Sequence, residues 1–342
     1  MAHKKTNIHY PLYPLSILYG MGVRFRNLLF DRGILKTRTF TVPIICVGNL
    51  TVGGTGKTPH IEYLIRLLSP HYRIAVLSRG YKRKSKGFLL ATAGITPGLL
   101  GDEPYQLWCK FPDLQVAVDS DRCHGIDQLL SQSQPPQVIL LDDAYQHRYV
   151  KAGLNLLLTD YNRPFYTDAL LPAGRLREGG SGKERADIFI VSKSPQTLSE
   201  NEVKKIEGNI SPTSKQKIFF SGLAYQPLRH VFTDIEMRLP NETHVLLVTG
   251  IARPELVENQ IKATYQLNES LVYPDHHDFT ETDIIKINHK FNSIKNKEKA
   301  IVVTEKDAVR LRHNPFLNDS LKENMYFLPL EIVFLHNETN RF

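Results

Sequence analysis

Eight consecutive residues of this sequence have the types and spacing of a phosphate-binding loop. The segment TVGGTGKT, residues 51–58, follows an apolar run and precedes a helical pattern. Its glycines let backbone N–H groups approach phosphate oxygens, Lys57 can reach the β and γ oxygens, and Thr58 can hold Mg²⁺. Thr51 stands where the usual pattern has its first glycine. We expect nucleotide contacts from the whole segment: Thr51, Val52, Gly53, Gly54, Thr55, Gly56, Lys57 and Thr58.

A second apolar run ends in two carboxylates. The segment QVILLDD, residues 137–143, places Asp142 and Asp143 at the end of a predicted strand. A carboxylate at such a strand end holds the metal ion in phosphate-loop enzymes. Carboxylates there also serve as ordinary capping groups, but a phosphate loop in the same sheet favours a metal role for Asp142.

The segments that could read a nucleotide base favour ATP over GTP. Proteins that bind GTP read guanine through the aspartate of an N-K-x-D segment. In IVSKSP, Pro195 stands where that aspartate would be, and in TEKD the residues Lys306 and Asp307 are adjacent.

Six short apolar runs predict the sheet that must position these residues, at 41–49, 74–80, 115–121, 137–143, 154–160 and 187–193. Most are almost continuously apolar, as parallel strands covered on both faces are. Helical segments separate them. We therefore expect an α/β fold of the P-loop NTPase type, with a doubly wound, mostly parallel sheet.

Later runs predict a second, smaller α/β domain, at 244–252, 300–311 and 325–334. A length of 342 residues fits one large domain with a smaller one. The expected organisation is an N-terminal helical segment over 1–40, a phosphate-loop core over 41–225, and the smaller domain over 226–342.

The net charge and the cysteine content indicate the class of partner and the cellular compartment. The net charge of +8 favours an acidic partner, which could be a nucleic acid, a nucleotide or an anionic membrane. The three cysteines, Cys46, Cys109 and Cys123, show no paired metal-ligand spacing. Their odd number, without a cleavable signal sequence, predicts a reducing cell interior.

The N-terminal segment combines apolar and basic residues. Residues 15–23 are apolar, and Arg24, Arg26 and Arg32 follow. A bilayer-spanning helix needs about 20 apolar residues, so this run is too short to cross. Such a helix can lie in the membrane interface, or it can pack on the core of its own protein.

Eight motifs in this order resemble the tetraacyldisaccharide 4'-kinase family of Gram-negative bacteria. They are VGNLTVGGTGKTP, LSRGYKRKSKG, GDEPYQL, VDSDR, LDDAYQH, LPAGRLRE, DHHDF and TEKD, and the similarity covers about residues 10 to 310. The family usually continues its acidic strand as Asp-Asp-Gly-Phe-Gln-His, whereas this sequence has Ala144 and Tyr145. The resemblance implies transfer of the ATP γ-phosphoryl group to the 4'-hydroxyl of an acylated glucosamine disaccharide 1-phosphate, which forms lipid IVA.

The resemblance also implies roles for single residues. Asp102 of GDEP would be catalytic together with His276 of DHHDF, with the adjacent His277 as the alternative. A positioned carboxylate suffices to accept a proton that leaves late in phosphoryl transfer. Glu103 and Asp142 would join Thr58 around Mg²⁺.

Basic and polar residues of the motifs are expected to face the anionic acceptor. The run Lys82, Arg83, Lys84 and Lys86 either meets the headgroup or is a solvated surface. A lipid acceptor would also place the N-terminal segment on anionic lipid at the cytoplasmic face of the bacterial inner membrane. We expect a monomer without a nucleic-acid partner. The residues expected on the substrate side are Arg79, Arg122, Asp143, Gln146, His147, Arg175 and Arg177.

Two other functions are weighed against the kinase. A P-loop ATPase or GTPase switch acting as a metallochaperone should offer cysteine or histidine pairs, but the cysteines here are isolated. An RNA-binding protein should show an aromatic and basic binding signature, and none is present.

Overall fold

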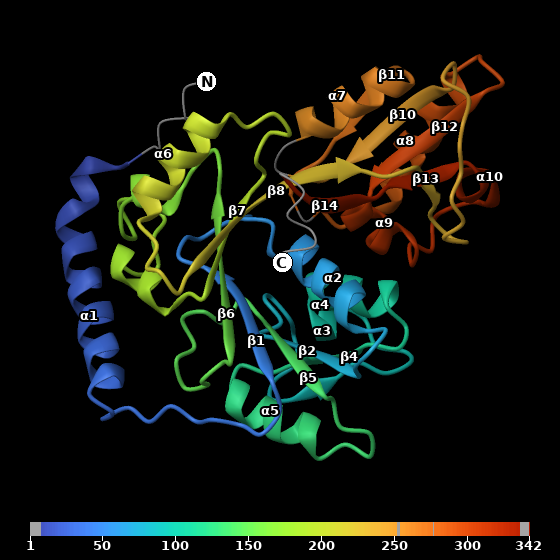
Figure 1. The fold of residues 1–342 in the computed structure, drawn as a ribbon. Helices are drawn as coiled ribbons and strands as arrows, with labels where there is room; N and C mark the ends of the chain where they lie inside the picture. Colours follow the sequence, from blue (N-terminus) through green and yellow to red (C-terminus); the bar gives the residue numbers. More distant parts are fainter. Residues whose placement is uncertain (1–7, 252–253, 276, 336–341) are drawn as a thin grey trace. The chain divides into compact units, whose positions relative to one another are not determined.

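The computed structural model describes residues 8–251, 254–275, 277–335 and 342, and the chain divides into two compact units (Figure 1). Unit 1 comprises Met1–Leu223 and Ile332–Phe342, and unit 2 comprises Ala224–Glu331. The predicted second domain, 226–342, thus includes a last strand whose contacts lie with unit 1.

Within the described residues, unit 1 is built on a nine-stranded sheet in the order β14-β8-β7-β6-β1-β5-β2-β4-β3. Neighbours from β8 to β4 are parallel, whereas β3 and β4 are antiparallel. The bounds are β1 (Ile44–Asn49), β2 (Ile74–Ser78), β3 (Leu89–Leu90), β4 (Gln115–Val118), β5 (Val138–Asp142), β6 (Leu154–Asp160), β7 (Ile188–Ser192), β8 (Lys217–Tyr225) and β14 (Leu330–Phe334).

The predicted fold class of unit 1 is confirmed, because each of the six apolar runs contains one parallel strand. Every residue of β2 and β5 is buried, as the continuous apolar pattern requires. The helical elements are η1 (Tyr10–Leu12), α1 (Tyr13–Asp31), α2 (Lys57–Leu68), α3 (Pro97–Leu100), α4 (Asp102–Lys110), α5 (Arg122–Leu130), η2 (Phe165–Thr167), η3 (Gly180–Arg185) and α6 (Glu200–Ile210).

Unit 2 contains, in its described part, a five-stranded sheet in the order β11-β10-β12-β13-β9. The strands β11, β10, β12 and β13 are parallel, and β9 is antiparallel to β13. The elements are β9 (Arg229–His230), β10 (His244–Thr249), α7 (Pro254–Thr264), β11 (Gln266–Val272), α8 (Glu281–Ser293), β12 (Lys299–Thr304), α9 (Glu305–Leu311), α10 (Asp319–Glu323) and β13 (Met325–Leu328).

Two of the apolar runs divide in ways that periodicity alone does not reveal. The run 300–311 changes from β12 to α9 at Thr304, whose side chain accepts from the N–H of Asp307 and caps the helix. The run 325–334 supplies β13 to one sheet and β14 to the other.

The helix α1 leaves much of its apolar surface uncovered. Its buried residues are Ser16 and Phe30, whereas Leu18, Met21 and Phe25 are 65%, 63% and 63% exposed. Packing on the core of the same protein therefore does not account for its apolar residues. No helix in the described parts of the chain has the length and apolarity that crossing a bilayer requires.

Candidate active site

The phosphate loop joins β1 to α2 at the carboxyl edge of the large sheet. It follows Asn49 and ends where α2 begins at Lys57. Gly53 and Gly56 have φ angles of 110° and 82°, a backbone conformation that favours glycine. Lys57 and Thr58 are the first two residues of α2, so the loop leads into a helix N-terminus, which favours bound phosphate.

The pairing of Thr51 explains why the loop has no glycine there. Thr51 forms an isolated antiparallel bridge with Leu176, and the N–H of Val52 donates to the carbonyl of Arg175 over 2.8 Å. This stretch is paired like a strand before the tight turn begins, and a β-branched residue suits paired backbone.

Two polar residues that the sequence did not assign to the site, Ser192 and Lys193, hold the loop, and a third, Asp160, binds Lys193. Ser192 Oγ donates to the carbonyl of Thr55 over 2.7 Å. Lys193 Nζ donates to the carbonyl of Gly54 and, over 2.8 Å, to Asp160 Oδ2. Asp160 and Ser192 end the parallel strands β6 and β7, and that shared position was the available signal.

Lys57 connects the loop to the acidic strand end. Its Nζ lies 3.4 Å from Asp143 Oδ1 and 3.5 Å from Asn49 Oδ1, and its side chain is 12% exposed. Asn49 Nδ2 in turn donates to Thr55 Oγ1 over 2.9 Å. The cation therefore stands between the turn of the loop and the end of β5.

Asp142 is a buried carboxylate with an unsatisfied oxygen. The residue is 3% exposed, and its Oδ1 has no hydrogen-bond partner among the described residues. Burial raises the pKa of Asp142 from its ordinary value near 3.8 to about 7, and the charge of Glu103 adds to this effect. An unpartnered carboxylate oxygen beside a second carboxylate is a donor set that fits Mg²⁺.

Asp143, the next residue, is fully engaged. Arg177 donates to both its carboxylate oxygens, over 2.8 and 3.1 Å, and also to Gln146 Oε1 over 3.3 Å. Burial acts to raise the pKa of Asp143, but Lys57 and Arg177 together outweigh it and hold the pKa below its usual value. Asp143 also has a φ of 49°. The left-handed backbone conformation of this turn is therefore adopted by Asp143 and not by the next residue, Ala144.

Arg122 and His147 lie near these carboxylates. Arg122 is buried and donates to the backbone carbonyls of Asp119 and Ser120, and burial lowers its pKa although Asp142 and Asp143 act to raise it. Burial, reinforced by Arg122, lowers the pKa of His147 to about 4, so its imidazole is neutral at pH 7. Arg79 follows β2 and is exposed.

Arg175 and Arg177, two residues apart, face different surroundings. Arg177 binds Asp143, whereas the exposed Arg175 lines a hollow beside the phosphate loop. The structure thus brings Arg177 to the acidic strand end and Arg175 to the hollow beside the phosphate loop. The hollow is lined by Thr51, Val52, Gly53, Gly54, Thr55, Asp160, Arg163, Asp168 and Arg175.

The residues of the basic run after β2 differ in their contacts and exposure. Arg83 donates to the carbonyl of Gly87 over 2.7 Å and to Ser85 Oγ over 3.2 Å, so it holds its own turn together. Lys82, Lys84 and Lys86 are exposed.

Asp102 and Glu103 begin α4. Asp102 is half-buried and Glu103 is exposed, and the charge of Glu103 reaches Asp142. Gly101, before them, has a φ of 96°, and a Cβ there would lie 3.3 Å from Gly80 Cα. This close approach sets the start of α4 against the turn after β2.

His276 lies outside the residues that the structure describes, and its neighbour His277 lies within them. His277 Nε2 is 2.9 Å from Asp283 Oδ2, and its ring stacks on Tyr273 with centroids 4.7 Å apart. Phe279 meets the same ring edge-on at 5.3 Å. These contacts give His277 a packing role within unit 2.

Comparison with known proteins identifies the family. A family model for tetraacyldisaccharide-1-P 4'-kinase matches residues 8–342. The tetraacyldisaccharide 4'-kinase of Bacteroides fragilis (strain YCH46) is 48% identical, with 100% of this chain and 93% of that protein covered. The enzyme of the same name from Bacteroides thetaiotaomicron is 49% identical, over 98% and 91% of the two chains. The chain belongs to the tetraacyldisaccharide 4'-kinase family.

A solved structure agrees with this assignment. LpxK from Aquifex aeolicus, crystallised in complex with ATP, matches with a TM-score of 0.77 at 30% identity and covers 97% of each chain. As a member of the tetraacyldisaccharide 4'-kinase family the protein is an ATP-dependent kinase, which confirms the predicted function class and excludes the nucleotide-driven switch.

Proposed function

We propose that the protein transfers the γ-phosphoryl group of ATP to the 4'-hydroxyl of a tetraacyldisaccharide 1-phosphate and so forms lipid IVA. Membership of the tetraacyldisaccharide 4'-kinase family supports this choice of acceptor. The observation that carries the proposal is the phosphate loop, whose Lys57 lies 3.4 Å from Asp143 at the strand end that also holds the buried Asp142.

The loop would bind the phosphate chain. Backbone N–H groups around Gly53 to Gly56 cradle the phosphates, and Lys57 reaches the transferred group. Thr58, Glu103 and Asp142 would hold Mg²⁺, which neutralises charge on the phosphate oxygens when it is bound. Lys193 and Ser192 support this role indirectly because they fix the carbonyls of Gly54 and Thr55.

Asp102 would accept the proton of the acceptor hydroxyl. Its place at the start of α4, next to Glu103, and its half-buried side chain suit a carboxylate that works beside a metal site. The family resemblance adds His276 as its partner in the reaction, and the packing of His277 against Tyr273 and Asp283 favours His276 over His277.

The acceptor would lie on the side of Arg177. This residue joins Asp143 and Gln146 into one network, while Arg122 and the neutral His147 stand close to the same carboxylates. Arg79 would add a cation for the 1-phosphate. Arg175 lines the hollow at the loop and would serve the nucleotide side instead.

The helix α1 would place this network at a membrane surface. Tyr19 donates to the carbonyl of Arg177 over 2.8 Å, and Arg26 donates to the carbonyl of Gln146 over 3.2 Å. The uncovered Leu18, Met21 and Phe25 suit a helix that lies in the interface without crossing it. We place the enzyme as a monomer on the cytoplasmic face of the inner membrane.

Vesicle sedimentation tests this placement. Leu18→Glu with Met21→Glu should release the protein from anionic vesicles, and high salt should weaken the binding that remains. Ile285→Glu, at an apolar position of unit 2 that is 62% exposed, is the control and should still sediment. Full sedimentation of the double variant would contradict the interfacial role.

Phosphate transfer tests the function itself. The purified protein is incubated with ATP labelled in the γ-phosphate and with tetraacyldisaccharide 1-phosphate in mixed micelles. We expect label in the lipid extract, and none there when the acceptor is omitted. Label that is released only as inorganic phosphate would overturn the proposal.

A further inference from the structure

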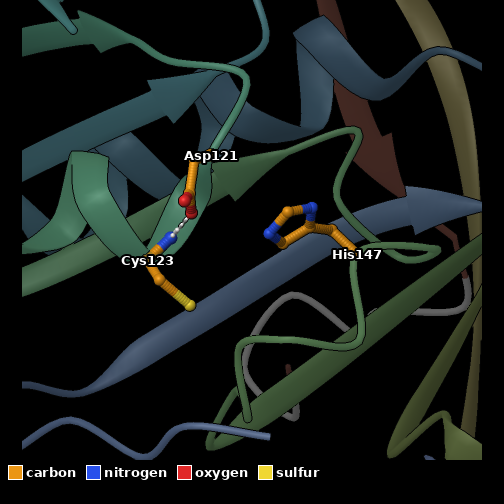
Figure 2. Close-up of side chains that lie close together, drawn as sticks. All are labelled: Asp121, Cys123 and His147. Atoms are coloured by element: carbon orange, nitrogen blue, oxygen red, sulfur yellow. Dashed lines mark hydrogen bonds between the residues drawn. The ribbon is translucent and has the colours of Figure 1, made fainter. Parts of the chain in front are cut away.

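Three side chains with metal-binding chemistry meet beside the start of α5. The ligand atoms of Asp121, Cys123 and His147 lie within 4.8 Å of one another. Asp121 is the N-cap of α5, Cys123 is in its first turn, and His147 follows the acidic end of β5 in sequence. Figure 2 shows the three side chains directed toward a common point.

His147 has an unused nitrogen at this point. Its Nε2 is buried and has no hydrogen-bond partner among the described residues, and Figure 2 shows this end of the ring facing Asp121 and Cys123. The neutral ring that its lowered pKa favours is the form that ligates metals.

The other two residues also offer ligand atoms. Asp121 Oδ1 accepts from the N–H groups of Cys123 and His124 and caps the helix, and a carboxylate has a second oxygen to offer. Cys123 Sγ donates to the carbonyl of Tyr149 over a long 3.5 Å, and a thiolate bound to a metal would give up this hydrogen bond.

We propose that Asp121, Cys123 and His147 form a binding site for a divalent transition metal, with Zn²⁺ as the preferred ion. Thiolate, imidazole and carboxylate are the three ligand types of Zn²⁺. Tetrahedral Zn²⁺ places its ligand atoms about 3.5 Å apart, so rotamer adjustments of roughly 1 Å complete the site. The fourth position stays open to water or to a small ligand.

The charges around the site decide which ion binds. Arg122, Arg26 and Arg79 act on His147 and oppose a cation, so a hard ion held by one carboxylate would bind weakly. A thiolate and a carboxylate together neutralise a divalent ion, and Zn²⁺ gains from the sulfur.

Cobalt spectroscopy of the full-length protein tests the site independently of phosphoryl transfer. Co²⁺ alone should give a thiolate charge-transfer band that saturates at about one equivalent and is displaced by Zn²⁺. Cys123→Ser should abolish the band, while Cys109→Ser, on α4, should keep it. His147→Ala should lower the affinity by about 10-fold or more.

Asp121→Asn separates ligation from folding. Asparagine caps a helix as well as aspartate does, so α5 should stay intact, yet the loss of charge should weaken Co²⁺ binding several-fold. Absence of the band in the parent protein, its survival in Cys123→Ser, or its loss in Cys109→Ser would overturn the proposal.

Discussion

Two buried carboxylates near the ends of parallel strands, one in each unit, have opposite neighbours. Asp142 at the end of β5 lies near the carboxylates of Glu103 and Asp143 and has an oxygen without a hydrogen-bond partner. Asp307 in α9, three residues after β12, accepts from the N–H of Gly250 over 2.9 Å and from Thr304 Oγ1 over 2.6 Å. Its Oδ1, like that of Asp142, has no hydrogen-bond partner among the described residues, but it lies 3.6 Å from the guanidinium of Arg310.

Burial raises the pKa of both groups, so burial alone does not distinguish a reactive carboxylate from a structural one. The neighbours do. The charges of Glu103 and Asp143 together outweigh that of Lys57 at Asp142, so its charged neighbours add to the effect of burial. At Asp307, two hydrogen-bond donors and the cations Arg310 and Lys306 all oppose the effect of burial. We therefore propose that Asp142 binds an external cation and that Asp307 stabilises the fold.

The largest expected effect comes from variants that test whether unit 2 contributes a residue to the reaction. Asp102→Ala and His276→Ala should each lower kcat by about 10²–10⁴-fold if Asp102 is the base and His276 assists it. The double variant should be little worse than Asp102→Ala, because residues that act as a unit are non-additive. Single-turnover transfer measures this. Multiplicative losses would separate the two residues, and an unimpaired His276→Ala enzyme would leave unit 2 without a catalytic role.

Lys57→Ala should reduce transfer by about 10²–10³-fold, because it removes a positioned cation from the developing charge on the phosphate. Steady-state kinetics with the lipid acceptor measures it. Lys290→Ala is the control, since it removes an exposed ion pair with Glu269 in unit 2 and should leave transfer unchanged. Near-normal activity of Lys57→Ala would mean that the loop does not bind the transferred phosphate.

The pH dependence of stability should separate the two carboxylates further. The raised pKa of Asp142 means that the folded state binds its proton more tightly than the unfolded state does. Its contribution to stability is thus present below about pH 4 and is lost as pH rises to about 7. Relative to the wild type, Asp142→Asn should gain about 2–4 kcal/mol between these pH values, measured by denaturant unfolding without Mg²⁺ or ATP. A pH-independent difference would contradict the raised pKa.

At pH 7 Asp307→Asn should lower the free energy of unfolding, whereas Asp142→Asn is expected to gain stability. The amide cannot accept from Thr304 and Gly250 as strongly as a carboxylate does, and Arg310 loses its counter-charge. A loss of about 1–3 kcal/mol in the free energy of unfolding is expected. Equal stability of the variant and the wild type would show that the site in unit 2 is not a structural one.

The sequence predicts the sheet of unit 1 well because its strands are buried on both faces and therefore read as continuous apolar runs. It predicts the course of 300–311 and 325–334 less well, because a side-chain cap at Thr304 and a change of sheet after β13 leave no mark on hydropathy. Apolar periodicity reports burial and cannot report which sheet a strand joins.

The residues of the site likewise fall into those that the sequence predicts and those that it does not. Motif spacing predicts roles for Lys57 and Asp142, whose neighbours in sequence form the loop and the strand. Lys193 and Asp160 come close to the loop because β6 lies beside β1 and β7 lies beside β6 in the sheet, and no local pattern encodes that order. The separate surroundings of Arg175 and Arg177 likewise depend on the strand-like pairing with the phosphate loop.

One measurement tests the contrast between the two carboxylates most directly. The rate of γ-phosphoryl transfer to tetraacyldisaccharide 1-phosphate is compared for Asp142→Asn and Asp307→Asn, per folded molecule, across a Mg²⁺ titration. Asp142→Asn should lose at least about 10²-fold at every Mg²⁺ concentration, because a ligand of the ion that stabilises the transferred charge is gone. Asp307→Asn should stay within about threefold of the wild type, as expected for a group that acts on stability alone. Wild-type transfer by Asp142→Asn, or an equal loss in both variants, would contradict the account.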